Sequence, residues 1–95
     1  MKAQPKCPIT TVATLLSDTW TILVMHQLID GPKRFCELER GLEGISTRTL
    51  TLKLGKLVKE GMIKKTKDGM YAATEKGRGI RIIENAMRRY EAKYL

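Results

Sequence analysis

The chain has 95 residues, of which 42% are hydrophobic, and its 18 lysines and arginines against 10 acidic residues give a formal net charge of +8. This composition predicts one small globular domain over residues 1–95 and excludes a chain that is disordered throughout. The basic balance favours nucleic acid or an anionic membrane surface as a partner. No apolar run approaches the roughly 20 residues that span a bilayer. No apolar signal segment follows the N-terminus, so we expect a cytoplasmic protein without a membrane partner.

Two helices are predicted in the first third of the chain. Pro8 suits the first position of a helix that presents an apolar face through Leu16. The Ser-Asp-Thr sequence at residues 17–19 breaks this helix and caps a second one, expected over residues 20–29. The residues of the second helix that we expect to be buried are Leu23, Val24 and Leu28. The Asp-Gly-Pro sequence that follows ends it.

A helix-turn-helix is predicted in the middle of the chain. Residues 33–35 form a short extended piece, at most a one-bridge strand, and residues 36–42 a short third helix. A glycine-containing turn at residues 43–45 leads into a fourth helix, which completes the helix-turn-helix pattern. The apolar stripe of this helix consists of Leu50, Leu54, Leu57 and Val58.

The fourth helix has both a start and a stop signal. Ser46 can accept a hydrogen bond from one of its first amides, and Gly61 can end it with a positive φ. Residues 49–54 also alternate as a strand would, but the long periodic run between two end signals favours a helix. Its basic face would point outward, and a helix of this width fits the major groove of DNA.

A hairpin and a long helix complete the chain. Residues 62–67 and 70–73 predict two strands joined by Asp68-Gly69, a strong hairpin signal, and this hairpin is the wing. Thr74 can cap a last helix over about residues 75–94. A heptad-like seam runs along it, and we expect this seam to form a homodimer interface: Ile80, Ile83, Met87, Tyr90 and Tyr94.

The predicted order of elements is that of a winged helix-turn-helix domain, mainly α with a small β-hairpin wing (α+β). Several segments together resemble the HxlR-type bacterial and archaeal transcriptional regulators. They are Cys7-Pro8, Trp20-Thr21, Leu28-Ile29-Asp30-Gly31-Pro32-Lys33-Arg34-Phe35, Glu37-Leu38, Gly44-Ile45-Ser46, Leu50, Leu54, Leu57, Glu60-Gly61 and Thr74-Glu75-Lys76-Gly77. The resemblance covers about residues 7–80. It implies a homodimer, joined through its terminal helices, that binds double-stranded DNA and regulates transcription without a catalytic step.

Two features depart from the pattern of this family. The wing is shorter than the family's usual proline-containing one, which puts minor-groove contacts by the wing in doubt. Cys36 stands where the family commonly has Asn, which would replace a good helix cap with a poor one and add a thiol.

The candidate DNA contacts lie on the fourth helix, the piece before the third helix and the wing. Arg48 is the best candidate for reading bases, because arginine grips guanine with two hydrogen bonds, and Leu52 could pack on a thymine methyl. The alternative for each lysine is a solvated surface. The full set is Ser46, Thr47, Arg48, Thr51, Leu52, Lys53, Lys56, Lys33, Arg34, Lys64, Lys65 and Lys67.

The two cysteines, Cys7 and Cys36, are not in a CxxC pattern, so neither a disulfide framework nor a zinc site is predicted. Cys7 should start the first helix, where unpaired amides favour a thiolate that oxidants or electrophiles can reach, and Lys6 adds positive charge. A disulfide to Cys36 of a second subunit is a further hypothesis. The alternative is two reduced, buried thiols. Some members of the family sense reactive species through the matching cysteine, and others respond to other signals, so a small-molecule or redox effector is left open.

No metal, cofactor or catalytic constellation is predicted. His26 has no second ligand at metal-binding spacing and is expected to be a structural or surface residue. Besides a DNA-binding regulator, two functions remain as alternatives. One is a winged-helix module that binds proteins without reading DNA. The other, a small thiol-redox protein, lacks the strand pattern of that class.

Overall fold

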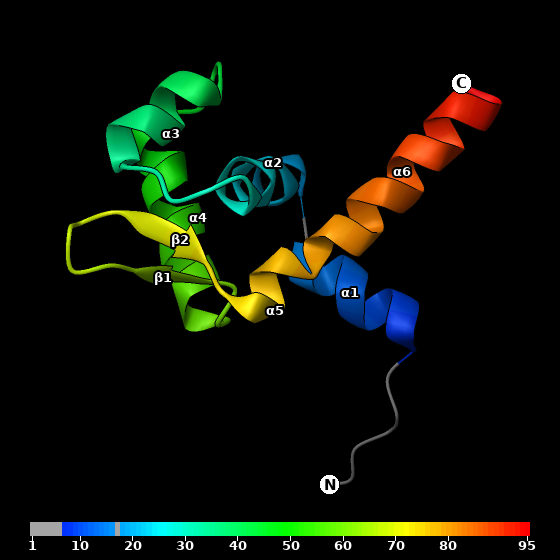
Figure 1. Ribbon diagram of the computed structural model, residues 1–95, viewed down its shortest axis with the longest axis horizontal. Coiled ribbons are helices and arrows are strands. Elements are labelled where there is room, and N and C mark those ends of the chain that lie inside the picture. The colour runs from blue at the N-terminus through cyan, green and yellow to red at the C-terminus, as the bar shows by residue number, and fades with distance from the viewer. Residues whose placement is uncertain (1–6, 17) are drawn as a thin grey trace, which may run out of the picture.

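The computed structural model describes residues 7–16 and 18–95, and these residues form six helices and two strands (Figure 1). The expectations for Ser17 and for residues 1–6, Lys6 included, lie outside the described residues. The elements are α1 Pro8–Leu16, α2 Thr19–Ile29, α3 Phe35–Gly41, α4 Thr47–Lys59, β1 Ile63–Lys65, β2 Tyr71–Ala73, α5 Glu75–Arg78 and α6 Ile80–Tyr94. This is the predicted order, and the winged helix fold is confirmed.

Helix α2 lies at the centre of the fold and contacts the other five helices and β2. In Figure 1, α3, α4 and the hairpin lie on one side of it, and α1 and α6 on the other. Val24, Met25 and Leu28 of α2 are at most 1% exposed. The rest of the hydrophobic core consists of Ile29 of α2 and of residues from both sides of α2: Leu16, Leu38, Leu42, Leu50, Leu54, Leu57, Met62, Ile63, Ala73 and Ile80.

Side-chain caps begin three of the helices where the sequence predicts them. Asp18 Oδ1 accepts from the Thr21 amide at 2.9 Å, and Ser46 Oγ from the Thr49 amide at 3.0 Å. Thr74 Oγ1 accepts from the Gly77 amide at 3.1 Å. These caps satisfy amides that have no partner within the helix, so they fix where α2, α4 and α5 start.

Helix α3 begins one residue earlier than predicted, which changes the role of Cys36. The helix starts at Phe35, and the backbone amide of Arg34 donates to Glu37 Oε1 at 2.8 Å. Cys36 is therefore the second residue inside the helix and not its cap. The prediction that a poor cap stands here was wrong, because the carboxylate of Glu37 stabilises the helix start instead.

The wing is an antiparallel hairpin in which Ile63 pairs with Ala73 and Lys65 with Tyr71. Its turn has three residues, 67–69, and not the two expected. The Gly69 amide donates to the Thr66 carbonyl at 3.0 Å, and Gly69 has a φ of 80°. A three-residue turn that ends on a left-handed glycine is a common hairpin connection. A single bridge from Lys33 to Tyr71 confirms the predicted one-bridge strand.

The last predicted helix is divided in two at Gly79, which lies between α5 and α6. Two glycines close together weaken a helix. Gly77 is also buried, and a Cβ built on it would lie 2.0 Å from the backbone oxygen of Met62. Because only a glycine permits this contact, α5 packs directly on the chain that enters β1, and α6 leaves in a new direction.

Two residues predicted to be buried are exposed instead. Leu23 is 38% exposed and Val58 43% exposed, whereas Met25, which the prediction omitted, is fully buried. The buried face of α2 is centred on Val24, Met25 and Leu28, and that of α4 on its three leucines, so Leu23 and Val58 fall on the flanks.

Among the described residues no single helix is long and apolar enough to cross a membrane. Helices α1 and α2 taken together, as a bent pair, have the length and composition of a membrane span, and nothing else marks them as one.

Candidate nucleic-acid interface

Helix α4 is held by one face and presents the opposite face to solvent. Leu50, Leu54 and Leu57 are each at most 2% exposed and pack into the core. Successive residues of an α-helix are rotated by about 100° around its axis, which places Arg48, Leu52 and Lys59 opposite those three leucines. Leu52 is 61% exposed. The outward face of α4 therefore carries two cations and one apolar side chain.

Arg48 lies at the start of this outward face, as the second residue of α4. It is exposed, and it forms no hydrogen bond or ion pair with another residue in the described part of the chain. Its five N–H donors are therefore available to a ligand.

The hydroxyl groups near the start of α4 already have partners within the chain. Thr47 Oγ1 donates to Glu39 Oε2 of α3, and Thr51 Oγ1 donates to the Thr47 carbonyl at 2.8 Å. Ser46 Oγ donates to Thr49 Oγ1 at 2.9 Å. These three predicted contact residues are exposed, but with their hydrogens engaged they can offer DNA only acceptor lone pairs.

Lys53, a predicted phosphate contact, is engaged within its own chain. Its Nζ forms an ion pair with Asp18 Oδ2, and its side chain is only 22% exposed. The hydrogen bond from Lys53 holds the pKa of the Asp18 carboxyl below its ordinary value, with a smaller contribution from the Thr21 amide. The sequence could not show this pair, because the two residues are 35 positions apart.

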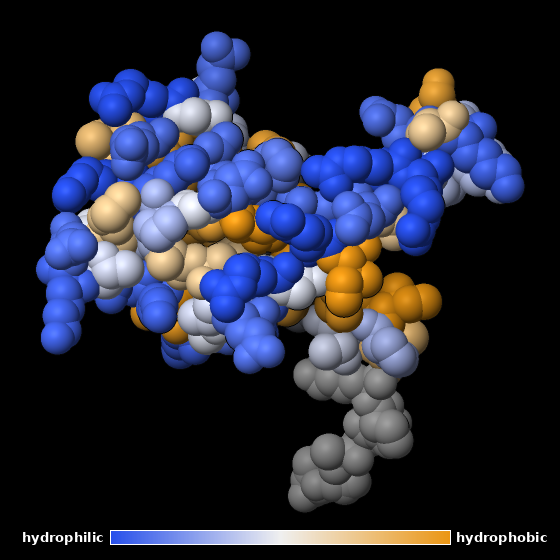
Figure 2. All heavy atoms as spheres, in the orientation of Figure 1, coloured by the Kyte–Doolittle hydropathy of each residue, from blue (hydrophilic) through white to orange (hydrophobic). Residues whose placement is uncertain are grey.

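The wing places further cations beside α3 and α4. Lys64, Lys65 and Lys67 are exposed, as is Lys56 on α4. Arg34 Nη1 donates to the Asp68 carbonyl at 3.1 Å, which ties the start of α3 to the tip of the wing. Lys33 is half-buried, with its backbone in the bridge to β2. Hydrophilic residues dominate the surface at this end of the molecule (Figure 2).

The predicted seam of α6 is divided between the core and the surface. Ile80 is 4% exposed and belongs to the core of its own chain, and Ile83 is half-buried against that core. Met87, Tyr90 and Tyr94 are exposed, and α6 projects away from the rest of the fold (Figure 1). The apolar surface open to a partner therefore begins at Ile83 and continues to the C-terminal end of the helix.

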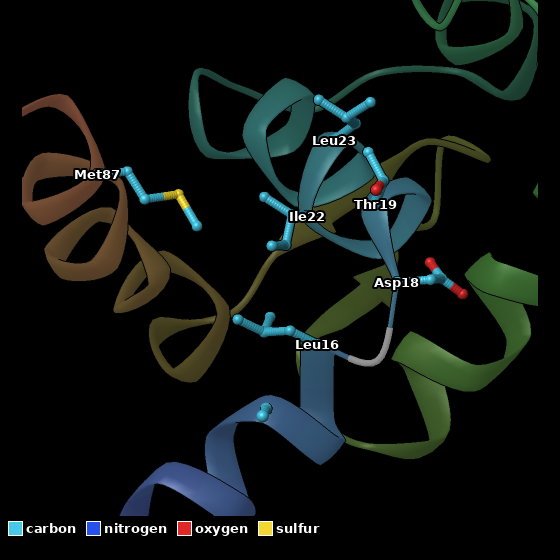
Figure 3. Close-up of a pocket in the computed structure, with 7 residues that line it drawn as sticks. Leu16, Asp18, Thr19, Ile22, Leu23 and Met87 are labelled. Atoms are coloured by element: carbon cyan, nitrogen blue, oxygen red, sulfur yellow. The ribbon is translucent and has the colours of Figure 1, made fainter. Parts of the chain in front are cut away.

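An apolar cavity of about 530 Å³ lies where α1, α2 and α6 approach one another (Figure 3). Figure 2 shows hydrophobic residues gathered in the same part of the molecule. The sequence did not indicate this cavity, because its walls come from three separate helices. The residues that line it are Ala13, Leu16, Asp18, Thr19, Ile22, Leu23 and Met87.

Both predicted sensor thiols are exposed, contrary to the alternative of two buried cysteines. Cys7 directly precedes α1, and its carbonyl accepts from the Thr11 amide at 3.0 Å. Hydrogen bonds from the backbone amides of Thr10 and Ile9 lower the pKa of the Cys7 thiol below its ordinary value. Helices α1 and α3 lie on opposite sides of α2 in Figure 1, so Cys7 and Cys36 do not meet within one chain.

His26 has a partner that the sequence did not reveal. Its Nδ1 lies 2.9 Å from Oε2 of Glu84, a carboxylate on α6 that is 8% exposed. This pair joins α2 to α6, so the expectation of a structural histidine agrees with its contacts. Within residues 7–16 and 18–95, no cluster of His, Cys, Asp and Glu could hold a metal ion.

A helix-turn-helix whose second helix is buried by one face, followed by a β-hairpin, defines a winged helix-turn-helix domain of the DNA-binding class. The chain belongs to the HxlR-like helix-turn-helix family, whose model matches residues 15–95. The resemblance drawn from the sequence is thereby confirmed.

Relatives and solved structures agree with this assignment. An HTH-type transcriptional regulator of Synechocystis sp. is 36% identical over 95 residues, covering 94% of this chain and 70% of the relative. The HTH-type regulator YdeP of Bacillus subtilis is 31% identical over 94 residues, covering 93% of this chain and 73% of the relative. Quinone-bound YodB from B. subtilis superposes with a TM-score of 0.85 at 29% identity, covering 94% of this chain and 100% of that one. The redox regulator HypR in its reduced form superposes with a TM-score of 0.80 at 27% identity, covering 92% of each chain.

These comparisons identify the chain as a transcriptional regulator of the helix-turn-helix type. Its relatives are regulators and not enzymes, as expected from a sequence without a catalytic constellation. A family of this kind implies DNA as the partner.

Proposed function

We propose that this protein, a single winged helix domain over residues 1–95, binds a two-fold symmetric operator in double-stranded DNA as a homodimer. Such a protein would regulate transcription in the cytoplasm. The observation that carries the proposal is the outward face of α4, where Arg48 and Leu52 are exposed opposite three buried leucines. An exposed arginine in the first turn of such a helix is suited to the paired acceptors of guanine in the major groove.

The homodimer is supported by the apolar surface that one chain leaves uncovered. Met87, Tyr90 and Tyr94 of α6 are 47%, 60% and 62% exposed, and Ile9 of α1 is 79% exposed. Contiguous apolar surface of this kind marks an interface, and a two-fold dimer buries the same patch on both subunits. Such a dimer would place two copies of α4 in successive major grooves, with half-sites about 10 base pairs apart or a multiple of it.

Selection of bound duplexes from a random pool tests the proposal and yields the operator. Arg48→Ala should then reduce discrimination between operator and random DNA by about 1–3 kcal/mol, because one base in each half-site loses its two hydrogen bonds. Arg89→Ala removes the same charge from α6 and serves as the matched control. If no sequence were enriched, the chain would be better described as a module that binds protein. If Arg48→Ala kept full discrimination, another residue would read the bases.

Cys7 is the best candidate for a sensor of electrophiles. Its thiol is exposed and has a lowered pKa, and solved structures similar to this chain include YodB with bound quinone and HypR in reduced and oxidized forms. The thiolate sulfur would add to a ring carbon of a quinone and form a C–S bond. The proton from that carbon and one from solvent would then move to the two ring oxygens, which gives a hydroquinone thioether without another oxidant.

The pH dependence of alkylation tests the Cys7 sensor. In a Cys36→Ser background, the iodoacetamide rate should rise with a midpoint below the roughly 8.5 of an unperturbed thiol, because the lowered pKa forms thiolate at lower pH. Quinone should then release the operator from this protein and not from Cys7→Ser. A midpoint at the ordinary value, with operator binding unchanged by quinone, would contradict the proposal.

A disulfide between Cys7 of one subunit and Cys36 of the other is a second route to oxidation. It would require Cα atoms within about 7 Å across the dimer. Diamide would accept two electrons and two protons from the thiols as the S–S bond forms. A covalent dimer on a non-reducing gel, absent in both Cys7→Ser and Cys36→Ser, is the expected result. A strictly monomeric band would exclude this route.

A further inference from the structure

One carboxylate connects the start of α2 to the middle of α4. Asp18 Oδ1 accepts from the backbone amide and the hydroxyl of Thr21 at 2.9 and 3.1 Å, and its Oδ2 accepts from Lys53 Nζ. Thr21 is 1% exposed, so the Oδ1 contacts hold the carboxylate against the core. Lys53 thus binds to a group whose own position is fixed.

The position of Lys53 on α4 differs from that of the outward residues. At about 100° per residue, Lys53 lies about 60° from the middle of the leucine face, on the flank that turns toward α2. Arg48 and Leu52 lie on the opposite face. The Lys53 side chain is 22% exposed and that of Asp18 38%, compared with 56% and 71% in the pair between Arg81 and Asp30. Solvent therefore screens the Lys53 pair less than an open surface pair.

Figure 3 shows the direction of the Asp18 side chain. It points toward α4, away from the apolar side chains of Leu16, Ile22 and Met87 that surround the cavity between α1, α2 and α6. Asp18 thus lies at the junction of α1 and α2 and reaches α4 from there.

We propose that Asp18 is a positioning residue for DNA reading, which acts through Lys53, and that Lys53 does not contact phosphate. The pair fixes the rotation of α4 relative to α2 and so determines where Arg48 and Leu52 meet the base edges. This inference rests on the proposed DNA-binding function. It also explains why Lys53 is turned inward, whereas Arg48 and Leu52 of the same helix are exposed.

The two roles of Lys53 predict opposite results for Asp18→Asn. Asparagine caps a helix about as well as aspartate, so the start of α2 should be preserved. If Lys53 were a phosphate ligand, removing its intramolecular partner and one negative charge would tighten binding to all DNA. If the pair positions α4, the same change should weaken operator binding by about two- to fivefold per subunit, the fold-change that corresponds to a partly exposed ion pair. Discrimination against random DNA should also decrease.

The salt dependence gives an independent readout with a matched control. A lost phosphate contact reduces the slope of log K against log salt by about 0.9. Lys59→Gln removes a charge from the outward face of the same helix, where a phosphate contact is available. Lys53→Gln should leave the slope unchanged while it lowers the discrimination between operator and random DNA. The double variant Asp18→Asn with Lys53→Gln should bind the operator no more weakly than either single variant. Partial unfolding would weaken binding to the operator and to random DNA by the same factor. A change in the discrimination between the two therefore reports the position of α4 and not the stability of the fold.

The proposal is overturned if Asp18→Asn binds operator as tightly as the wild type or more tightly, or if Lys53→Gln lowers the salt slope by the amount of one contact per subunit. A measurement without DNA separates this inference from the proposed function. The unfolding midpoints of the four proteins in the cycle should show coupling between positions 18 and 53. If the wild type bound no duplex, the proposed function would fail, and the absence of coupling would refute the pair itself.

Discussion

The body of the fold, residues 19–73, buries most of its large hydrophobic residues, whereas the terminal helices α1 and α6 leave most of theirs at least partly exposed. In the body, Leu38, Leu50 and Leu54 are at most 1% exposed, and charged residues lie outside. In the terminal helices, Ile9 and Tyr90 are 79% and 60% exposed, although both belong to regular apolar stripes. A single chain therefore buries the hydrophobic residues of the body, whereas the apolar stripes of α1 and α6 would be buried only in an assembly of chains. Three pairs of substitutions test this difference.

The largest effect is expected in the body. Leu54→Ala should lower the free energy of unfolding by about 2–5 kcal/mol, because it leaves a cavity beneath α4. Leu52→Ala, two residues away on the outward face, should change that free energy by less than about 0.5 kcal/mol. Urea denaturation followed by circular dichroism measures both. Equal losses for the two variants would mean that α4 is not held by the leucine face.

The second effect concerns the terminal helices. Tyr90→Asp places a charge in the proposed interface and should weaken dimerisation by more than about a hundredfold, the loss expected at a central interface residue. Asn85→Asp adds the same charge on the opposite side of α6 and should leave the dimer intact. Sedimentation at micromolar concentration distinguishes the two. A wild-type protein that sedimented as a clean 10.8 kDa species would refute the dimer itself.

The third effect concerns the point where the two regions meet. His26→Ala leaves the buried carboxylate of Glu84 without its closest partner, and should destabilise the fold by about 1–3 kcal/mol. Asp30→Asn breaks the open pair with Arg81, whose atoms are 3.8 Å apart, and should cost about 0–1 kcal/mol. Hydrogen exchange at the amides of α6 should accelerate only in His26→Ala. Slow exchange in both variants would show that packing alone holds α6.

The sequence predicted the elements that depend on local chemistry. The caps Asp18, Ser46 and Thr74 and the leucine face of α4 each follow from a short stretch of residues, and all are present in the structure. Spacing within one helix also placed Arg48 and Leu52 on the outward side. These features could be predicted because hydrogen bonding at a helix end and the helical repeat are local.

The features that the sequence missed depend on contacts between distant residues. The pairs of Asp18 with Lys53 and of His26 with Glu84 join residues 35 and 58 positions apart. The division of the last helix depends on how closely Gly77 approaches the backbone of Met62. Charge and periodicity along a chain do not specify which segments meet, so Lys53 was counted among the candidate DNA contacts.

The smallest effect is expected in α4, at a position where a gain in stability should be accompanied by weaker DNA binding. Gly55 lies inside this helix, and a Cβ built on it would meet nothing within 4 Å. No packing within the chain therefore requires a glycine there, and Gly55→Ala should raise the free energy of unfolding by about 0.5–1 kcal/mol through helix propensity. Its residue position faces outward beside Arg48 and Leu52, where the backbone of α4 would approach the groove. We therefore expect operator binding to weaken as the melting temperature rises by several degrees. Tighter or equal operator binding by Gly55→Ala would show that this part of α4 stays away from DNA.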